Sequence, residues 1–209
     1  MHLSSLPSPH GIGSMGEPAR QFADFLQQAG QACWQLLPVC PTSYGDSPYQ
    51  SFSTYAGNPY FIDLDELERQ GYLRREEYEN IDWECGPDRI NYGVLYEKRY
   101  PVLEKAAERF RENPPEDYER FCRENARWLD DYACFMALKD AHGGAPWFDW
   151  EPALRNREEQ ALEEACARYA EQIEFWKICQ YLFFEQWKAL RSYVNERGIR
   201  IIGDLPIYV

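Results

Sequence analysis

The sequence has 209 residues, of which 44% are hydrophobic and 16% aromatic, so it has ample material for a buried core and is too apolar for a disordered chain. Its formal net charge of −13 argues against nucleic acid or an anionic membrane surface as a partner, because both attract Lys and Arg. No apolar run approaches the roughly 18 residues of a membrane helix and no signal peptide is visible, so we expect a cytoplasmic protein with no membrane partner.

The first part of the chain indicates a helix, a short strand and a long irregular loop. Residues 17–29 carry apolar side chains at helical spacing and stop at Gly30, which predicts an amphipathic helix. The apolar run 33–37, which ends at Pro38, predicts a buried strand. Residues 41–60 combine prolines, glycines and aromatic residues with small polar ones, which favours a surface loop that packs on itself.

The chain between about residues 65 and 197 is almost entirely helical in pattern. The spacing predicts helices over 65–68, 92–111 and 115–141. Residues 157–197 contain neither glycine nor proline and keep a helical apolar stripe. A single helix of that length would run roughly 60 Å, about twice the diameter of a small domain. We therefore expect either a bend in this helix or a helix that projects past the main body.

Residues 199–204 predict a second strand, with the carboxylate of Asp204 at its C-terminal end. The order helix, strand, loop, helical block, strand indicates an α/β protein. A parallel crossover needs only about a dozen residues, whereas about 160 separate the two predicted strands. The surplus predicts an inserted helical subdomain.

An α/β barrel would need eight strands and roughly 250 residues, more than this chain offers. Met1-His2-Leu3 reads as the stub of an earlier strand, and the chain stops at residues 207–209 within an apolar run, so both ends look truncated. We expect a partial (β/α)8 TIM barrel, consisting of the first strands only, with a large helical insertion. Barrel sites lie at the carboxyl ends of strands, where the loop 41–60 and Asp204 would converge.

Cysteine usage predicts no disulfide framework and no zinc site. The seven cysteines are odd in number and irregular in spacing, and they form no CxxC pair. Because most of them fall on apolar faces, we expect buried, reduced thiols.

Four segments together point to a known family. SSLPSPHGIGSMG, CWQLLPVCPTSYGDSPYQSFSTYAGNPYFIDL, FMALKDAHGG and IRIIGDLPIYV resemble the N-terminal part of the 4-α-glucanotransferases, also called amylomaltases or disproportionating enzymes, and the resemblance extends over essentially all 209 residues. It implies a (β/α)8 barrel with helical insertions. It also implies transfer of α-1,4-glucan segments between maltooligosaccharides or to glucose, through a covalent glycosyl-enzyme and without metal or organic cofactor. The implied partners are α-1,4-glucans.

The resemblance also implies a division of the chain. Residues 1–64 would be the N-terminal part of the barrel, with the donor-site loop at 41–60. Residues 65–156 would be the helical insertion subdomain. Residues 157–209 would hold a long helix and the third barrel strand, with the remainder of the barrel absent from this sequence.

Retaining transfer requires two carboxylates roughly 5–5.5 Å apart, one as nucleophile and one as general acid and base. In the family both lie on later strands, which would follow Val209. We therefore assign no catalytic residue in this chain and expect the isolated 209-residue piece to be inactive.

The substrate-binding residues implied by the resemblance lie in the loop and at the last strand. Tyr49 matches a tyrosine that lines the donor site, where a ring offers an apolar face to sugar C–H groups and a hydroxyl to sugar oxygens. Asp204 matches the aspartate that ends the third strand and helps to hold the donor sugar. Ser47 and Asp46 are candidate partners for sugar hydroxyls, and Tyr44 matches a tyrosine of a secondary glucan contact.

The sequence is also compatible with two other functions. One is a non-catalytic carbohydrate-binding or interaction fragment, although unpaired strand edges and exposed apolar faces argue against an independent existence. The other is a retaining α-glucan hydrolase of the same barrel superfamily, with water as the acceptor. Only the family resemblance favours transfer over hydrolysis.

Overall fold

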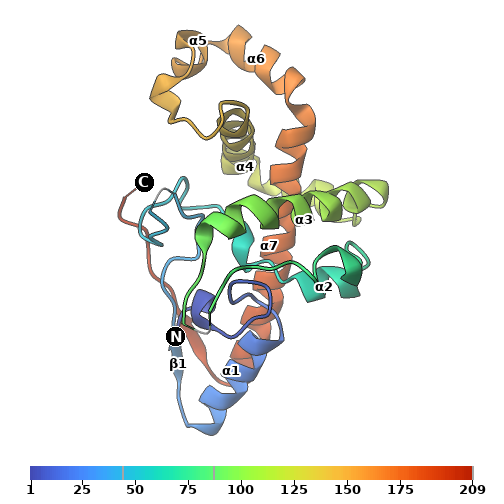
Figure 1. The fold of residues 1–209 in the computed structure, drawn as a ribbon. Coiled ribbons are helices and arrows are strands. Elements are labelled where there is room, and N and C mark those ends of the chain that lie inside the picture. The colour runs from blue at the N-terminus through green and yellow to red at the C-terminus, as the bar shows by residue number, and fades with distance from the viewer. Residues whose placement is uncertain (44, 87, 209) are drawn as a thin grey trace. The chain divides into compact units, whose positions relative to one another are not determined.

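The computed structural model describes residues 1–43, 45–86 and 88–208, a helix-rich chain with a small parallel sheet (Figure 1). The helices are α1 (Glu17–Gln28), α2 (Leu64–Arg69), α3 (Tyr92–Glu112), α4 (Tyr118–Ala141), α5 (Pro152–Arg155), α6 (Glu159–Arg168) and α7 (Ala170–Glu196). The strands are β1 (Cys33–Gln35) and β2 (Arg200–Ile202). Short 3-10 helices are η1 (Leu3–Ser5), η2 (Pro59–Phe61), η3 (Arg75–Glu77) and η4 (Trp147–Asp149).

The chain forms two compact units. We call Met1–Pro114 together with Gln180–Val209 unit 1, and Pro115–Cys179 unit 2. The residues of α7 are divided between them. No helix among the described residues has the length and apolar character that a membrane crossing requires.

The two strands pair in parallel, with Trp34 opposite Ile201. The backbone N–H of Leu36 donates to the carbonyl of Ile202 at 2.9 Å, and that of Arg200 donates to Ala32 at 3.0 Å. Both predicted strands are thereby confirmed, although each is shorter than its apolar run. Since parallel strands run in one direction, the segments that follow β1 and β2 leave from the same edge of the sheet.

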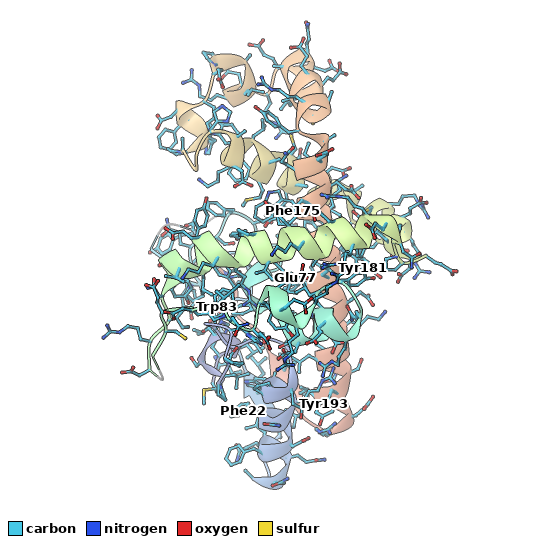
Figure 2. All side chains as sticks on the ribbon, turned by 45° about the vertical axis from the view of Figure 1, so that its right-hand side comes forward. Phe22, Glu77, Trp83, Phe175, Tyr181 and Tyr193 are labelled. Carbon is cyan, nitrogen blue, oxygen red and sulfur yellow. The ribbon has the colours of Figure 1, made fainter. Side chains whose placement is uncertain are left out.

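Helix α1 covers β1 and packs on the part of α7 that belongs to unit 1. Phe22 on α1 meets the buried ring of Trp34 edge-on, with ring centroids 5.1 Å apart. Asp24 accepts hydrogen bonds from the Tyr193 hydroxyl, at 3.0 Å, and from the Arg197 guanidinium. Phe22 of α1 and Tyr193 of α7 are labelled in Figure 2. The amphipathic helix predicted here is confirmed, because its apolar stripe provides the face that is buried.

The helical segment predicted over 157–197, for which a bend was one of the two expected outcomes, is interrupted at Tyr169 and forms two helices, α6 and α7. The backbone of Tyr169 has φ −109° and ψ 26°, outside helical values. Its ring packs on a buried cluster of unit 2 formed by Leu138, Trp150 and Ala165. The break coincides with this tertiary contact. No glycine or proline marks its position in the sequence.

Two smaller predictions were wrong in part. The helix placed at 115–141 begins at Tyr118, whose N–H closes a turn on the Pro115 carbonyl at 3.0 Å. The cysteines are not mostly buried: Cys40 and Cys179 are, whereas Cys85 and Cys166 are exposed and the other three are half-buried. Side chains at the rim of a helix contact keep apolar spacing but remain open to solvent.

Candidate functional site

The loop 41–60 after β1 is held together by its own backbone. Thr42 and Ser51 form an antiparallel bridge, and the N–H of Ser43 donates to the carbonyl of Gln50 at 3.2 Å. Between them the chain turns, with the N–H of Asp46 donating to the Ser43 carbonyl at 3.1 Å. Asp46 has a φ of 59°, a left-handed conformation that aspartate tolerates better than most residues.

The loop also pairs with the chain that follows β2. The N–H of Tyr208 donates to the carbonyl of Tyr49 at 3.0 Å, and the N–H of Ser51 donates to the carbonyl of Tyr208 at 3.0 Å. These bonds form a parallel bridge between Gln50 and Tyr208. The bridge fixes the loop against the segment that begins at Asp204.

Tyr49 and Asp204 meet at this edge, although 155 positions separate them in the sequence. The Tyr49 hydroxyl donates to Oδ2 of Asp204 at 2.8 Å, while Oδ1 of Asp204 accepts the N–H of Leu205 at 2.9 Å. The hydrogen bond to Asp204 raises the pKa of Tyr49, because the carboxylate stabilises the protonated phenol. Tyr49 is half-buried and Asp204 is exposed. The pair therefore presents a ring face, a phenolic oxygen and a carboxylate to a ligand.

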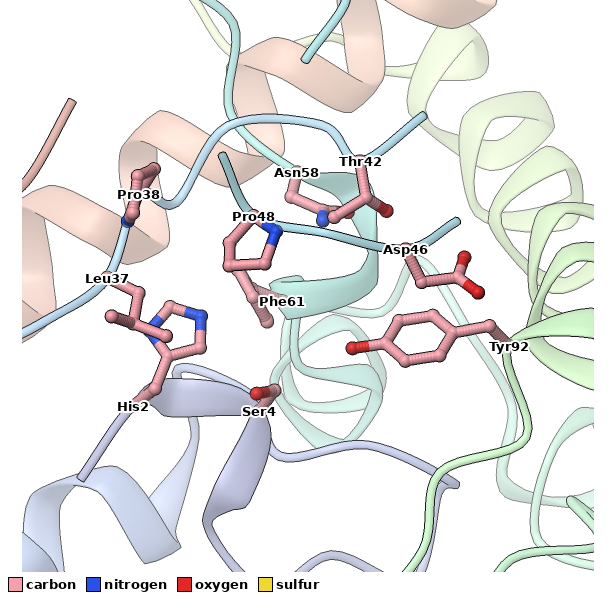
Figure 3. A pocket seen from close by; sticks show the side chains of 10 residues that line it. All are labelled: His2, Ser4, Leu37, Pro38, Thr42, Asp46, Pro48, Asn58, Phe61 and Tyr92. Carbon is pink, nitrogen blue, oxygen red and sulfur yellow. The ribbon is translucent and has the colours of Figure 1, made fainter. Parts of the chain in front are cut away.

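A cavity of about 100 Å³ lies beside the loop (Figure 3). Its lining comes from the chain start, the segment after β1, the loop and α3, namely His2, Ser4, Leu37, Pro38, Thr42, Asp46, Pro48, Asn58, Phe61 and Tyr92. The Tyr92 hydroxyl points into it, and Nδ1 of His2 is buried with no hydrogen-bond partner among the described residues. Burial lowers the pKa of His2 to about 4, so its imidazole is neutral at pH 7.

Two buried glutamines of α7 hold the limb through which the loop returns, residues 57–63. Gln180 accepts the N–H of Gly57 at 2.7 Å and donates to its carbonyl at 3.0 Å. Gln186 does the same for Asp63, at 2.7 and 3.2 Å. Each side-chain amide thus satisfies both backbone groups of one residue, as a neighbouring strand would.

The return limb is also fixed by close packing and by a buried guanidinium. A Cβ at Gly57 would lie 2.0 Å from a ring carbon of Phe183, so only glycine fits. Arg99 of α3 is fully buried and donates to the carbonyls of His10 and Ile62. Burial lowers the pKa of Arg99 to about 10, which leaves it charged at neutral pH.

The model of the family described as 4-alpha-glucanotransferase matches residues 1–209, the whole chain. The chain belongs to this family. It is 50% identical over 213 aligned residues to the 4-alpha-glucanotransferase of Thermus thermophilus and 45% identical over 209 to that of Clostridium butyricum, covering 42% and 43% of those proteins. The chain thus spans less than half the length of these relatives.

Solved structures agree with this assignment. The amylomaltase from Streptococcus agalactiae, solved in complex with acarbose, superposes with a TM-score of 0.96 at 43% identity, over 100% of this chain and 43% of that one. The amylomaltase from Corynebacterium glutamicum shares the fold, with a TM-score of 0.69 at 20% identity over 99% of this chain and 29% of that one.

The structure gathers some of the residues that the family resemblance singles out and separates others. Tyr49 and Asp204 are in contact, and Ser47 supports them locally, since its Oγ accepts the N–H of Tyr49 at 3.3 Å. Asp46 instead lines the neighbouring cavity, where burial raises its pKa. Tyr44 lies outside the described residues.

Sequence reasoning did not place Tyr92 or His2 at the site. Tyr92 opens a predicted helix, and nothing in its local pattern distinguishes it from a packing residue. His2 carried a signal, since it lies in the expected strand stub Met1-His2-Leu3, just before the Ser- and Pro-rich loop that begins at Ser4. Among the described residues, no group of three or more His, Cys, Asp or Glu side chains is placed to hold a metal ion.

Proposed function

We propose that this chain forms part of the glucan-binding cleft of a 4-α-glucanotransferase, which moves α-1,4-glucan segments between maltooligosaccharides or to glucose by retaining double displacement. Family membership over all 209 residues supports the reaction class. The proposal of a binding cleft rests on the 2.8 Å hydrogen bond between Tyr49 and Asp204, which joins the loop after β1 to the segment after β2.

The fold that we propose is the first part of a (β/α)8 barrel with a helical insertion. Its support is the parallel pairing of β1 and β2 and the position of Tyr49 and Asp204 beyond their carboxyl ends, where barrel enzymes bind substrate. The structural neighbour from Streptococcus agalactiae binds acarbose, which is in keeping with a carbohydrate ligand.

Each residue of the cleft has a role that follows from its chemistry. The Asp204 carboxylate accepts hydrogen bonds from hydroxyls of the donor sugar, and the ring of Tyr49 covers the apolar face of that sugar. The bond to Asp204 fixes the direction of the Tyr49 hydroxyl. Ser47 and Asp46 serve as further contacts to sugar hydroxyls, and Tyr44 belongs to a secondary glucan contact.

The reacting groups are two carboxylates roughly 5–5.5 Å apart, a nucleophile that forms the glycosyl-enzyme and an acid that protonates the leaving oxygen. A sugar hydroxyl then takes the place of water in the second displacement. We assign neither carboxylate to residues 1–209, and we place both in the part of the relatives that this chain does not cover.

A chimera tests this function. Residues 1–209 replace the matching N-terminal part of the Thermus thermophilus relative, and the chimera is incubated with maltotriose. Transfer predicts glucose together with products longer than maltotriose, whereas hydrolysis predicts only glucose and maltose. A folded chimera that releases no glucose, or turnover by the 209-residue chain alone, would contradict the proposal.

The cleft residues are tested in the same chimera. Asp204→Asn and Tyr49→Phe remove one partner of the hydrogen bond at a time, and we expect each to lower kcat/KM for maltotriose by about tenfold or more. Tyr55→Phe is the control, because Tyr55 lies in the same loop and is 66% exposed. Equal kcat/KM values for the Asp204 variant and the control would show that Asp204 does not contribute to substrate binding.

A further inference from the structure

Two cysteines of unit 2 face each other across a helix contact. Cys134 lies on α4 and Cys166 on α6, and their sulfur atoms are 3.5 Å apart. That separation is van der Waals contact between two thiols, since a disulfide bond measures about 2.05 Å. The 32 positions between them and the absence of a CxxC pattern hide this proximity from the sequence.

The packing around the pair holds both helices in place. Leu138, one turn after Cys134, is buried in the same cluster as Ala165, the neighbour of Cys166. Cys134 itself packs against this cluster. Because this cluster packs beside both cysteines, it keeps their sulfur atoms close to each other.

The two thiols differ in access to solvent. Cys166 is exposed, so a small disulfide in solution can reach its sulfur. Cys134 is half-buried behind it, a position suited to a second, resolving thiol. The pair therefore has the two properties that thiol exchange needs, an accessible attacking sulfur and a resolving sulfur within reach.

We propose that Cys134 and Cys166 form a modification site, a thiol pair that closes a reversible disulfide between α4 and α6 by exchange with a low-molecular-weight disulfide such as oxidised glutathione. The Cys166 thiolate attacks one glutathione sulfur, which forms a mixed disulfide and releases one glutathione thiolate. The Cys134 thiolate then attacks Sγ of Cys166 and releases the second. The protein loses two hydrogens, and one molecule of oxidised glutathione becomes two of reduced glutathione.

The charged surroundings of Cys134 determine how this exchange depends on pH. Burial, followed by the contact with Cys166, raises the pKa of the Cys134 thiol above its ordinary value. The Arg157 guanidinium nearby opposes this rise, and the Asp131 carboxylate, which pairs with Arg157 at 2.7 Å, adds to it. A higher pH increases the thiolate fraction of Cys134, so we expect the resolving step to become faster as the pH rises.

The test uses the 209-residue chain, oxidised glutathione, alkylation of free thiols and mass mapping of peptides. We expect a mass loss of about 2 Da, a linked peptide that contains Cys134 and Cys166, and reversal by dithiothreitol. Closure should also raise the thermal midpoint of the chain, because a cross-link restricts the unfolded state.

Three serine variants separate this site from general thiol reactivity. Cys134→Ser should stop at a glutathione adduct on Cys166, and Cys166→Ser should lose most of the reaction at Cys134. Cys85→Ser is the matched control, since Cys85 is also exposed, and it should still form the link. A persistent adduct on Cys166 in the unaltered chain at pH 8, or a link that joins other cysteines, would overturn the proposal.

Discussion

The tip of the loop and its return limb differ sharply in how they are held. Residues 57–63 are buried throughout, and two glutamines of α7 satisfy backbone groups at either end. Residues 46–50 are exposed or half-buried, and they are held by short backbone bonds and by the contact between Tyr49 and Asp204. The limb thus provides a rigid base, while the tip keeps its polar groups available to a ligand.

The largest effect on stability is expected at Gly57, where the return limb packs against Phe183 with no room for a side chain. Gly57→Ala places a Cβ 2.0 Å from a ring carbon of the buried Phe183, so we expect a loss of about 3 kcal/mol or more in the free energy of unfolding. Urea denaturation of the chain measures it. Gly203→Ala is the control, since a Cβ there meets nothing within 4 Å. Similar midpoints for the two variants would show that the limb is not tightly packed.

The next effect tests the hydrogen bonds of the limb without changing its volume. Gln180→Leu leaves the N–H and carbonyl of Gly57 buried and unpaired, so we expect a loss of about 2 kcal/mol. Gln160→Leu, on the exposed surface of α6, should change stability by less than about 0.5 kcal/mol. If both variants unfold at the same urea concentration, the glutamine does not anchor the loop.

A small effect on stability is expected at the tip. Tyr49→Phe removes one hydrogen bond at an exposed carboxylate, and we expect a change within about 0.5 kcal/mol in the free energy of unfolding. This outcome, together with the loss of transfer expected in the chimera, would separate ligand binding from folding at this residue. A loss comparable to that of Gln180→Leu would instead make the tip part of the structural base.

The smallest signal is the titration of a single phenol. The bond to Asp204 raises the pKa of Tyr49 above the ordinary value of 10.0. Because the folded value is the higher one, the bond stabilises the fold below about pH 10, and this contribution is lost as the pH rises through the raised pKa. The difference in tyrosinate absorbance between the unaltered chain and Tyr49→Phe should have its midpoint above pH 10. A midpoint at or below that value would contradict the hydrogen bond.

Local pattern predicted those features whose causes are local. The helices over 17–29 and 92–111 were predicted within one residue at each end, because apolar spacing and end signals act over a few neighbouring positions. Both strands followed from short apolar runs bounded by Gly or Pro. The break at Tyr169 was not predicted at its residue, since it accompanies packing on a distant cluster.

The candidate site was predictable only in part. Parallel strands send their carboxyl ends to one edge, so the sequence and its family resemblance indicated that Tyr49 and Asp204 would approach each other. The cavity beside the loop was not predicted, because its lining joins the chain start to α3. The proximity of Cys134 and Cys166 was missed for the same reason, since spacing along the chain says nothing about sulfurs on two different helices.

The sequence by itself determined the family, the helical periodicity and the position of the polar residues at the strand ends. Only the tertiary structure decided which of those residues touch, how the loop is anchored and where the long helical segment divides. The reason is physical. Periodicity records which face of an element is apolar, whereas a hydrogen bond such as that between Gln180 and Gly57 joins groups 123 positions apart and exists only once the elements have packed.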